Sequence, residues 1–272
     1  MGNNESSNTN PQNPTISTTK TEENKNNKIN ETTIVKKEEN KIEMVLVEEE
    51  DDEMKDSKMI ICFKNLYGMK KKIDEEKAKK ICIEASKNGD PLAEAMMIFK
   101  GWHLTIQNSI KALECCEELV KNKAHENKEE SYCHLLMGLI HSSGKGIDKN
   151  IKKSKNSFEI SAKKENCIAM YFLALLLIEE NKDEKKNQES AIKWLEKSSQ
   201  MGHILSYKKL AEIYLESGNY IKAKNIFESL VQIQDLDAIN ILANMYIDGR
   251  ISKNIMMAKE LLQQGVNLGF LF

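Results

Sequence analysis

One short pattern recurs along this chain, and it limits the fold more than any other feature. Its clearest copy runs from Leu210 to Tyr214 and is followed by Gly218 and then Ala223. When its small residue is taken as the reference, copies lie at positions 62, 98, 138, 174, 211 and 243. A recurrence at 20 to 50 residues is typical of proteins built from stacked structural repeats.

Each copy has the features of a helix hairpin. The second helix carries a small or apolar residue seven positions after its own small residue, as at Ala85, Ser161 and Ser198, and such pairs share one helix face. The glycine between the helices suits a left-handed helix end. Since one hairpin cannot bury its own apolar face, the hairpins must stack. We therefore expect an all-α fold, an α-solenoid in which about six antiparallel helix hairpins form a right-handed superhelix.

The first 57 residues differ in composition from the rest. They contain 7 Lys against 14 Asp and Glu, two of the three prolines and no aromatic residue, whereas residues 58–272 carry 33 basic and 28 acidic side chains. A segment so poor in large apolar residues cannot offset the entropy lost on ordering. We expect residues 1–57 to form a disordered acidic tail and residues 58–272 to form the repeat array.

The repeat resembles the Sel1-like repeat family, a relative of the tetratricopeptide repeats. Gly144-Lys145-Gly146-Ile147 is similar to the loop of that family, and Glu189–Gly202 is similar to its second helix. The fifth copy has a shorter loop, similar to a plain tetratricopeptide unit, and the second copy lacks the glycine between its helices. The resemblance covers about residues 58–268 and implies a helical array that binds proteins, without a residue code for any partner.

Composition argues against several functions. Of the 40 basic residues only Arg250 is arginine, and bidentate recognition of phosphate favours arginine, so we expect no nucleic-acid partner. No apolar run approaches the length of a membrane-spanning helix. The first 28 residues contain no apolar segment of a secretory signal, so we expect a cytoplasmic protein with reduced cysteines.

No set of reactive residues indicates catalysis or metal binding. Cys62 and Cys133 occupy small-residue positions and are expected in the core, and the adjacent Cys115 and Cys116 lack zinc-site spacing. His141 takes the place of a packing tyrosine. Ser-x-x-Lys, which resembles an element of penicillin-binding proteins, occurs at three serines without the partner motifs; these are Ser161, Ser190 and Ser206. We expect no enzyme, no cofactor and no metal.

The tail holds two candidate motifs. Met1–Ser6 matches the N-myristoylation pattern at Gly2, and a single acyl chain needs a second membrane signal, such as Lys70–Lys72 or the lysines at 152, 153 and 155. Val45, Leu46 and Val47 precede the acidic run of residues 48–53 and resemble a SUMO-interacting motif. The acidic run is alternatively a solubilising segment, or one that neutralises Lys70–Lys72 within the same chain.

A partner groove is expected on the first helices of the hairpins, by analogy with tetratricopeptide arrays. The residues expected to face it are Tyr132, Leu135, Leu139, Ile168, Tyr171, Leu175, Lys208, Glu212, Asn240 and Asn244. Tighter packing would instead bury Ile168 and Leu175. The favoured function is a non-enzymatic scaffold or adaptor that binds a protein segment. The alternatives are a myristoylated signalling adaptor on a membrane and a hydrolase of the penicillin-binding type.

Overall fold

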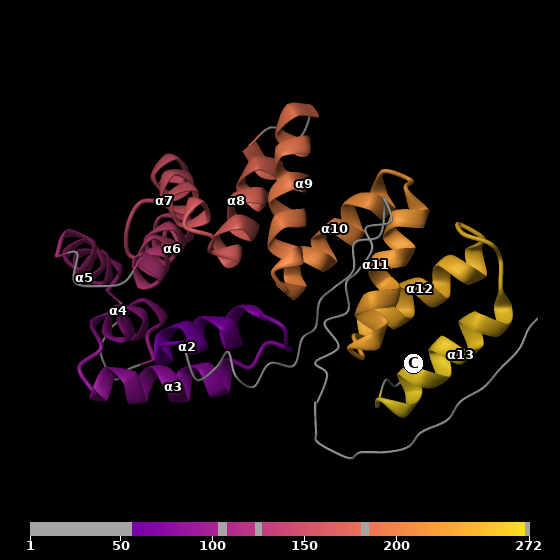
Figure 1. Ribbon diagram of the computed structural model, residues 1–272, viewed down its shortest axis with the longest axis horizontal. Helices are drawn as coiled ribbons and strands as arrows, with labels where there is room; N and C mark the ends of the chain where they lie inside the picture. Colours follow the sequence, from indigo (N-terminus) through magenta and orange to yellow (C-terminus); the bar gives the residue numbers. More distant parts are fainter. Residues whose placement is uncertain (1–55, 103–107, 123–126, 181–184, 270–272) are drawn as a thin grey trace, which may run out of the picture. The chain divides into compact units, whose positions relative to one another are not determined.

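The computed structural model describes residues 56–102, 108–122, 127–180 and 185–269, and their regular structure is helical (Figure 1). The predicted disorder of the tail lies almost entirely outside these residues. The described helices pair in sequence order into six hairpins, numbered 1 to 6. They are α2 (Lys58–Tyr67) with α3 (Glu75–Lys87), α4 (Pro91–Lys100) with α5 (Ser109–Lys121), α6 (Asn127–Ser143) with α7 (Ile151–Lys163), α8 (Cys167–Glu180) with α9 (Lys185–Gln200), α10 (Ile204–Glu216) with α11 (Tyr220–Gln232), and α12 (Leu236–Asp248) with α13 (Ile255–Asn267).

Local sequence signals set the ends of these helices. Most begin at Asp or Asn, whose side chain accepts a hydrogen bond from a first-turn N–H group, as Asp90 does from the N–H groups of Leu92 and Ala93. Several first helices end at a glycine with positive φ, including Gly68 and Gly249. Hairpin 2 was expected to lack this glycine, but Gly101 ends α4 in the left-handed conformation. Gly101 follows the reference position 98 by three residues instead of six, because α4 stops about one turn early.

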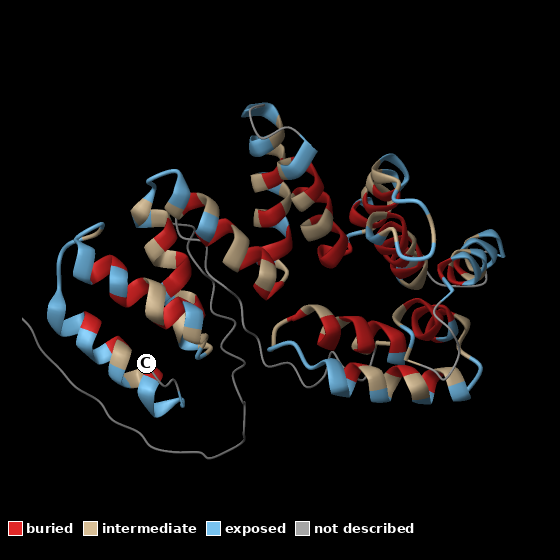
Figure 2. Cartoon of the chain, turned by 180° about the vertical axis from the view of Figure 1, so that it is seen from behind, coloured by how far each residue is buried: buried red, intermediate tan, exposed pale blue. Residues whose placement is uncertain are grey.

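The small-residue positions form the helix crossings. Those of the second helices are all buried, among them Ala78, Ser154 and Ala223. The Ser154 hydroxyl donates a hydrogen bond to the Gly138 carbonyl at 2.9 Å, so the reference residues of α6 and α7 touch. Figure 2 shows buried residues where helices face one another and exposed residues on the outer faces. The prediction of an all-α solenoid of helix hairpins is confirmed.

A second set of side chains joins the two helices within a hairpin by hydrogen bonds to backbone. The Ser161 hydroxyl donates to the Ser131 carbonyl and the Ser198 hydroxyl to the Cys167 carbonyl, each at 2.7 Å. These bonds occupy equivalent places in hairpins 3 and 4. They satisfy buried hydroxyls that would otherwise destabilise the fold. No helix among the described residues is long and apolar enough to cross a membrane.

Candidate functional site

The residues expected to line a partner groove divide into two groups. On α6 and at the start of α8, Leu135 and Ile168 are fully buried, and Tyr132 and Leu139 are more than 90% buried. The other six lie on α8, α10 and α12 and keep access to solvent; they are Tyr171, Leu175, Lys208, Glu212, Asn240 and Asn244. Leu135 and Ile168 therefore belong to the core and contact no partner in this conformation.

Hairpin 1 contacts the N-terminal part of the expected groove at Tyr132. The ring of Phe63, on α2, lies 4.8 Å from that of Tyr132 between centroids, and the ring of Tyr67 meets Phe172 edge-on at 5.5 Å. Tyr132 belongs to α6 in hairpin 3 and Phe172 to α8 in hairpin 4. In a simple solenoid each repeat contacts only its neighbours. Hairpin 1 departs from that rule, because it packs against hairpins two and three places along the array.

The loop that follows α2 extends this contact to hairpin 5. The Lys70 N–H donates to the Gly202 carbonyl at 2.8 Å, and the Ile204 N–H donates to the Gly68 carbonyl at 3.0 Å. These two bonds flank an isolated antiparallel β-bridge between Met69 and His203. Gly202 has a φ of +86°, and a Cβ there would lie 2.8 Å from the Lys70 side chain. The close approach therefore requires glycine. No periodic signal in the sequence indicated this contact.

A basic cleft lies where hairpin 1 meets the array. It has a volume of about 550 Å³ and is bordered by α2, the loop after it, the start of α6, the turn between α7 and α8, and the end of α9. Its lining residues are Lys64, Met69, Lys70, Lys128, Ser131, Tyr132, Lys164, Glu165, Asn166, Cys167, Gln200 and Met201. Four are lysines and one is acidic, so the cleft favours an anionic ligand.

A carboxylate already lies at this cleft. One oxygen of Asp56 is 2.5 Å from the Lys64 ammonium group, and its other oxygen is 2.5 Å from that of Lys128. Burial alone would raise the pKa of Asp56, but hydrogen bonds from Lys128 and Lys64 and their charges outweigh burial and lower the pKa below its ordinary 3.8. Lys164 pairs with Glu130 at 2.8 Å. Two carboxylates of the chain itself, those of Asp56 and Glu130, therefore pair with three of the four lysines of the cleft.

The other candidate reactive groups serve packing. Ser161 and Ser206 are fully buried, and the Ser190 hydroxyl donates to the Lys186 carbonyl of its own helix. The prediction that Cys62 and Cys133 lie in the core is confirmed. Burial raises the pKa of Cys133 to about 12, which keeps this thiol protonated. Among the described residues, no cluster of His, Cys, Asp and Glu could hold a metal ion.

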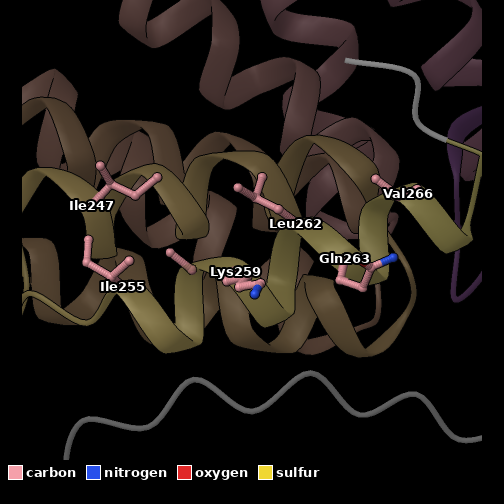
Figure 3. A pocket seen from close by; sticks show the side chains of 7 residues that line it. Ile247, Ile255, Lys259, Leu262, Gln263 and Val266 are labelled. Atoms are coloured by element: carbon pink, nitrogen blue, oxygen red, sulfur yellow. The ribbon is translucent and has the colours of Figure 1, made fainter.

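An apolar surface remains open on hairpin 6. Ile247 of α12 and Ile255, Leu262 and Val266 of α13 line a shallow pocket of about 350 Å³ (Figure 3). The neighbouring Met256 is 74% exposed. In the interior of the array, the corresponding faces pack against the next hairpin. The described part of the chain shows nothing that covers this one.

Helix hairpins stacked in series, each joined to the next at small residues, define a helical-repeat protein of the solenoid class. The Sel1 repeat model matches residues 131–166, 167–203 and 236–270. These ranges correspond to hairpins 3, 4 and 6, and hairpin 5, with its shorter loop, falls between the matches. The chain therefore contains three Sel1 repeats.

Solved structures share this fold. One is the protective antigen c5321 of uropathogenic Escherichia coli, which displays an SLR fold; the identity is 20% and the TM-score 0.54, over 78% of this chain and 46% of that one. The other is a Sel1 repeat protein from Oxalobacter formigenes, with 16% identity and a TM-score of 0.52, over 78% of this chain and 86% of that one. A search of curated proteins found no match.

Proposed function

We propose that this chain is a scaffold that binds a segment of a partner protein along the open first helices of hairpins 4 to 6. The single observation that carries the proposal is the accessible set of six expected groove residues on α8, α10 and α12, which we term the open row. Sel1 repeats typically mediate protein–protein interaction. The expected groove residues on α6 and at the start of α8 are buried, so the open row is the available part.

The open row changes from apolar to polar along the array. Leu175 and Tyr171 offer half-buried apolar surface on α8. On α10, Lys208 is held between Asp235 at 2.7 Å and Asp237 at 3.0 Å, which orders its side chain before binding. On α12 the Asn244 side-chain amide donates to the Asn240 side-chain oxygen at 3.2 Å. An apolar anchor beside pre-ordered polar groups suits an extended peptide with one apolar and several polar side chains.

Affinity purification of the full chain, followed by binding measurements with each purified partner, tests this proposal. We expect Leu175→Glu and Asn244→Lys to weaken the binding of the same partner by about tenfold or more, because each places a new charge in the interface. Ile221→Glu is the matched control, since Ile221 is 73% exposed on α11, a second helix. Partner affinities that do not respond to either change in the open row would refute the proposal.

The N-terminal pattern at Gly2 supports a second proposal, that a myristoylated form associates with membranes. Gly2 and the hydrophobic residues Val45–Val47 lie outside the described residues. The exposed Lys152 and Lys153 on α7 offer the second signal that one acyl chain requires. Mass spectrometry of the mature N-terminus tests for the myristoyl group. An unmodified Gly2 would exclude the myristoylated form and favour a cytoplasmic scaffold.

A further inference from the structure

We propose that the basic cleft is a binding site for acidic peptide segments and that the chain's own acidic run, residues 48–53, occupies it. Neither the family nor the open row implies such a site, which lies between hairpin 1 and hairpins 3 and 4. It exists only because hairpin 1 packs back onto the array. Failure of the open row to bind a partner therefore leaves this inference intact.

Asp56 identifies the occupant. Its side chain is 3% exposed and bridges Lys64 of α2 and Lys128 of α6, two lysines that line the cleft, so the chain passes beside the cleft at this residue. The six residues 48–53 are all Glu or Asp, and the last of them precedes Asp56 by three positions. An extended chain covers about 3.3–3.6 Å per residue, which lets these carboxylates reach across the cleft. The acidic run is therefore tethered at the mouth of a site of opposite charge.

The chemistry of the cleft favours carboxylates in series over a single phosphate group. Its cations are the lysines at 64, 70, 128 and 164, which come from four separate segments. Lysine acts as a compact point charge on a flexible stem, whereas the planar fork of arginine binds one carboxylate or phosphate group in bidentate fashion, so lysines on separate segments suit several separated negative charges. Ser131 and Asn166 also line the cleft, and both are already hydrogen-bonded: the Asn166 side-chain amide donates to the Ser131 hydroxyl, which donates to the Lys128 carbonyl.

Occupation by the tethered run implies competition. A tethered segment acts at an effective concentration in the millimolar range. Another acidic segment therefore gains full access to the cleft only when the run is displaced or neutralised. The run regulates the cleft through charge, without a change in the fold of the array.

The test measures the binding of a fluorescent peptide of residues 44–55 to the full-length chain by polarisation. One chain is wild type, and in the other the run is neutralised by changing its Glu to Gln and its Asp to Asn. We expect the peptide to bind the neutralised chain about tenfold more tightly or better, because its cleft has no tethered competitor. Added salt should weaken this binding.

A charge-matched pair of variants locates the site. In the neutralised chain, Lys70→Gln/Lys128→Gln/Lys164→Gln should abolish peptide binding. The control, Lys80→Gln/Lys87→Gln/Lys121→Gln, removes the same charge from exposed positions on α3 and α5 and should leave binding unchanged. Circular dichroism confirms that both variants fold.

Three results would overturn the inference. The first is equal affinity of the wild-type and neutralised chains for the peptide. The second is an equal loss of binding in the two triple variants, which would show that general charge and not the cleft binds the peptide. The third is binding of the neutralised chain to phosphatidylserine vesicles, lost in the cleft variant, with no binding of the peptide, which would assign the cleft to a membrane surface.

Discussion

Single residues at the helix crossings carry much of the packing in this array. Gly138 lies directly under the ring of Phe158, so α6 and α7 approach closely there. Elsewhere the same kind of position holds alanine, cysteine or serine, and the hydroxyl or thiol donates to a carbonyl across the crossing, as Cys62 does to Ala78 at 3.3 Å. The need for a small side chain and the need for a local hydrogen bond together explain why these positions are recognisable in the sequence as recurring Gly, Ala, Cys or Ser.

Gly138→Ala is expected to destabilise the protein. Alanine in a helix normally stabilises relative to glycine by about 0.5–1 kcal/mol. Here the added Cβ would lie 2.4 Å from a ring carbon of the buried Phe158, and such overpacking costs about 1–3 kcal/mol. Urea denaturation measures the net loss. Adding Phe158→Leu should recover part of the loss caused by Gly138→Ala, whereas strictly additive effects of the two changes would contradict the overlap.

His203 is expected to make stability fall as the solution is acidified. Burial lowers its pKa from 6.5 to about 3, and Nδ1 lies 2.8 Å from the Ser206 hydroxyl oxygen. Below pH 6.5 the His203 imidazole binds a proton in the unfolded chain but stays neutral in the folded chain. The free energy of unfolding therefore falls by about 1.4 kcal/mol per pH unit of acidification. The lowered pKa values of His134 and His141, also due to burial, act in the same direction.

Urea denaturation between pH 7 and pH 5 measures this dependence. The free energy of unfolding should fall by about 2 kcal/mol less between pH 6.5 and pH 5 in His203→Asn than in the wild type, because asparagine does not titrate. Parallel curves for the wild type and the variant would contradict the assignment to His203.

At the scale of helices and hairpins, the sequence predicts the array but not the contact that hairpin 1 makes with later hairpins. Each hairpin must meet the next one at the same small positions. Small residues therefore recur at a regular spacing in the sequence. Phe63 and Tyr67 form part of the apolar face that any helix in such an array would have. Nothing in a single sequence connects them with Tyr132 or Phe172, so the groove positions taken from the tetratricopeptide analogy included Tyr132, whose ring packs against Phe63 of hairpin 1.

The contact of α2 with α8 is expected to hold the following loop in place. Tyr67→Leu removes the edge-on ring contact with Phe172, an interaction of about 0.5–1.5 kcal/mol. Hydrogen exchange at the amides of Lys70 and Ile204, which bond across this contact, should speed up by up to about tenfold. Tyr220→Leu on α11 is the control. Unchanged exchange at both amides would show that the loop holds its place without the rings.

For the molecule as a whole, contacts between distant hairpins should raise the cooperativity of unfolding. An array with only neighbour contacts frays from its ends, and hairpin 1 would open first. Here hairpin 1 is bonded to hairpins 3, 4 and 5, so the buried thiols of Cys62, Cys133 and Cys167 are expected to become reactive at the same urea concentration. Pulse labelling with iodoacetamide and peptide mass spectrometry measure this. Reaction of Cys62 well before the other two would contradict the prediction.

The contacts of hairpin 1 also determine where such a chain tolerates a change in length. An extra hairpin inserted between α4 and α8 would move Tyr132 or Phe172 away from α2 and break the backbone bonds at Gly68 and Lys70. A hairpin added after α13 would disturb none of these bonds and would meet the apolar surface around Ile255 and Val266. Duplicated repeats are therefore compatible with this fold at its C-terminal end. Between hairpins 1 and 5 the number of repeats is fixed, because hairpin 1 must still reach the later hairpins that it contacts.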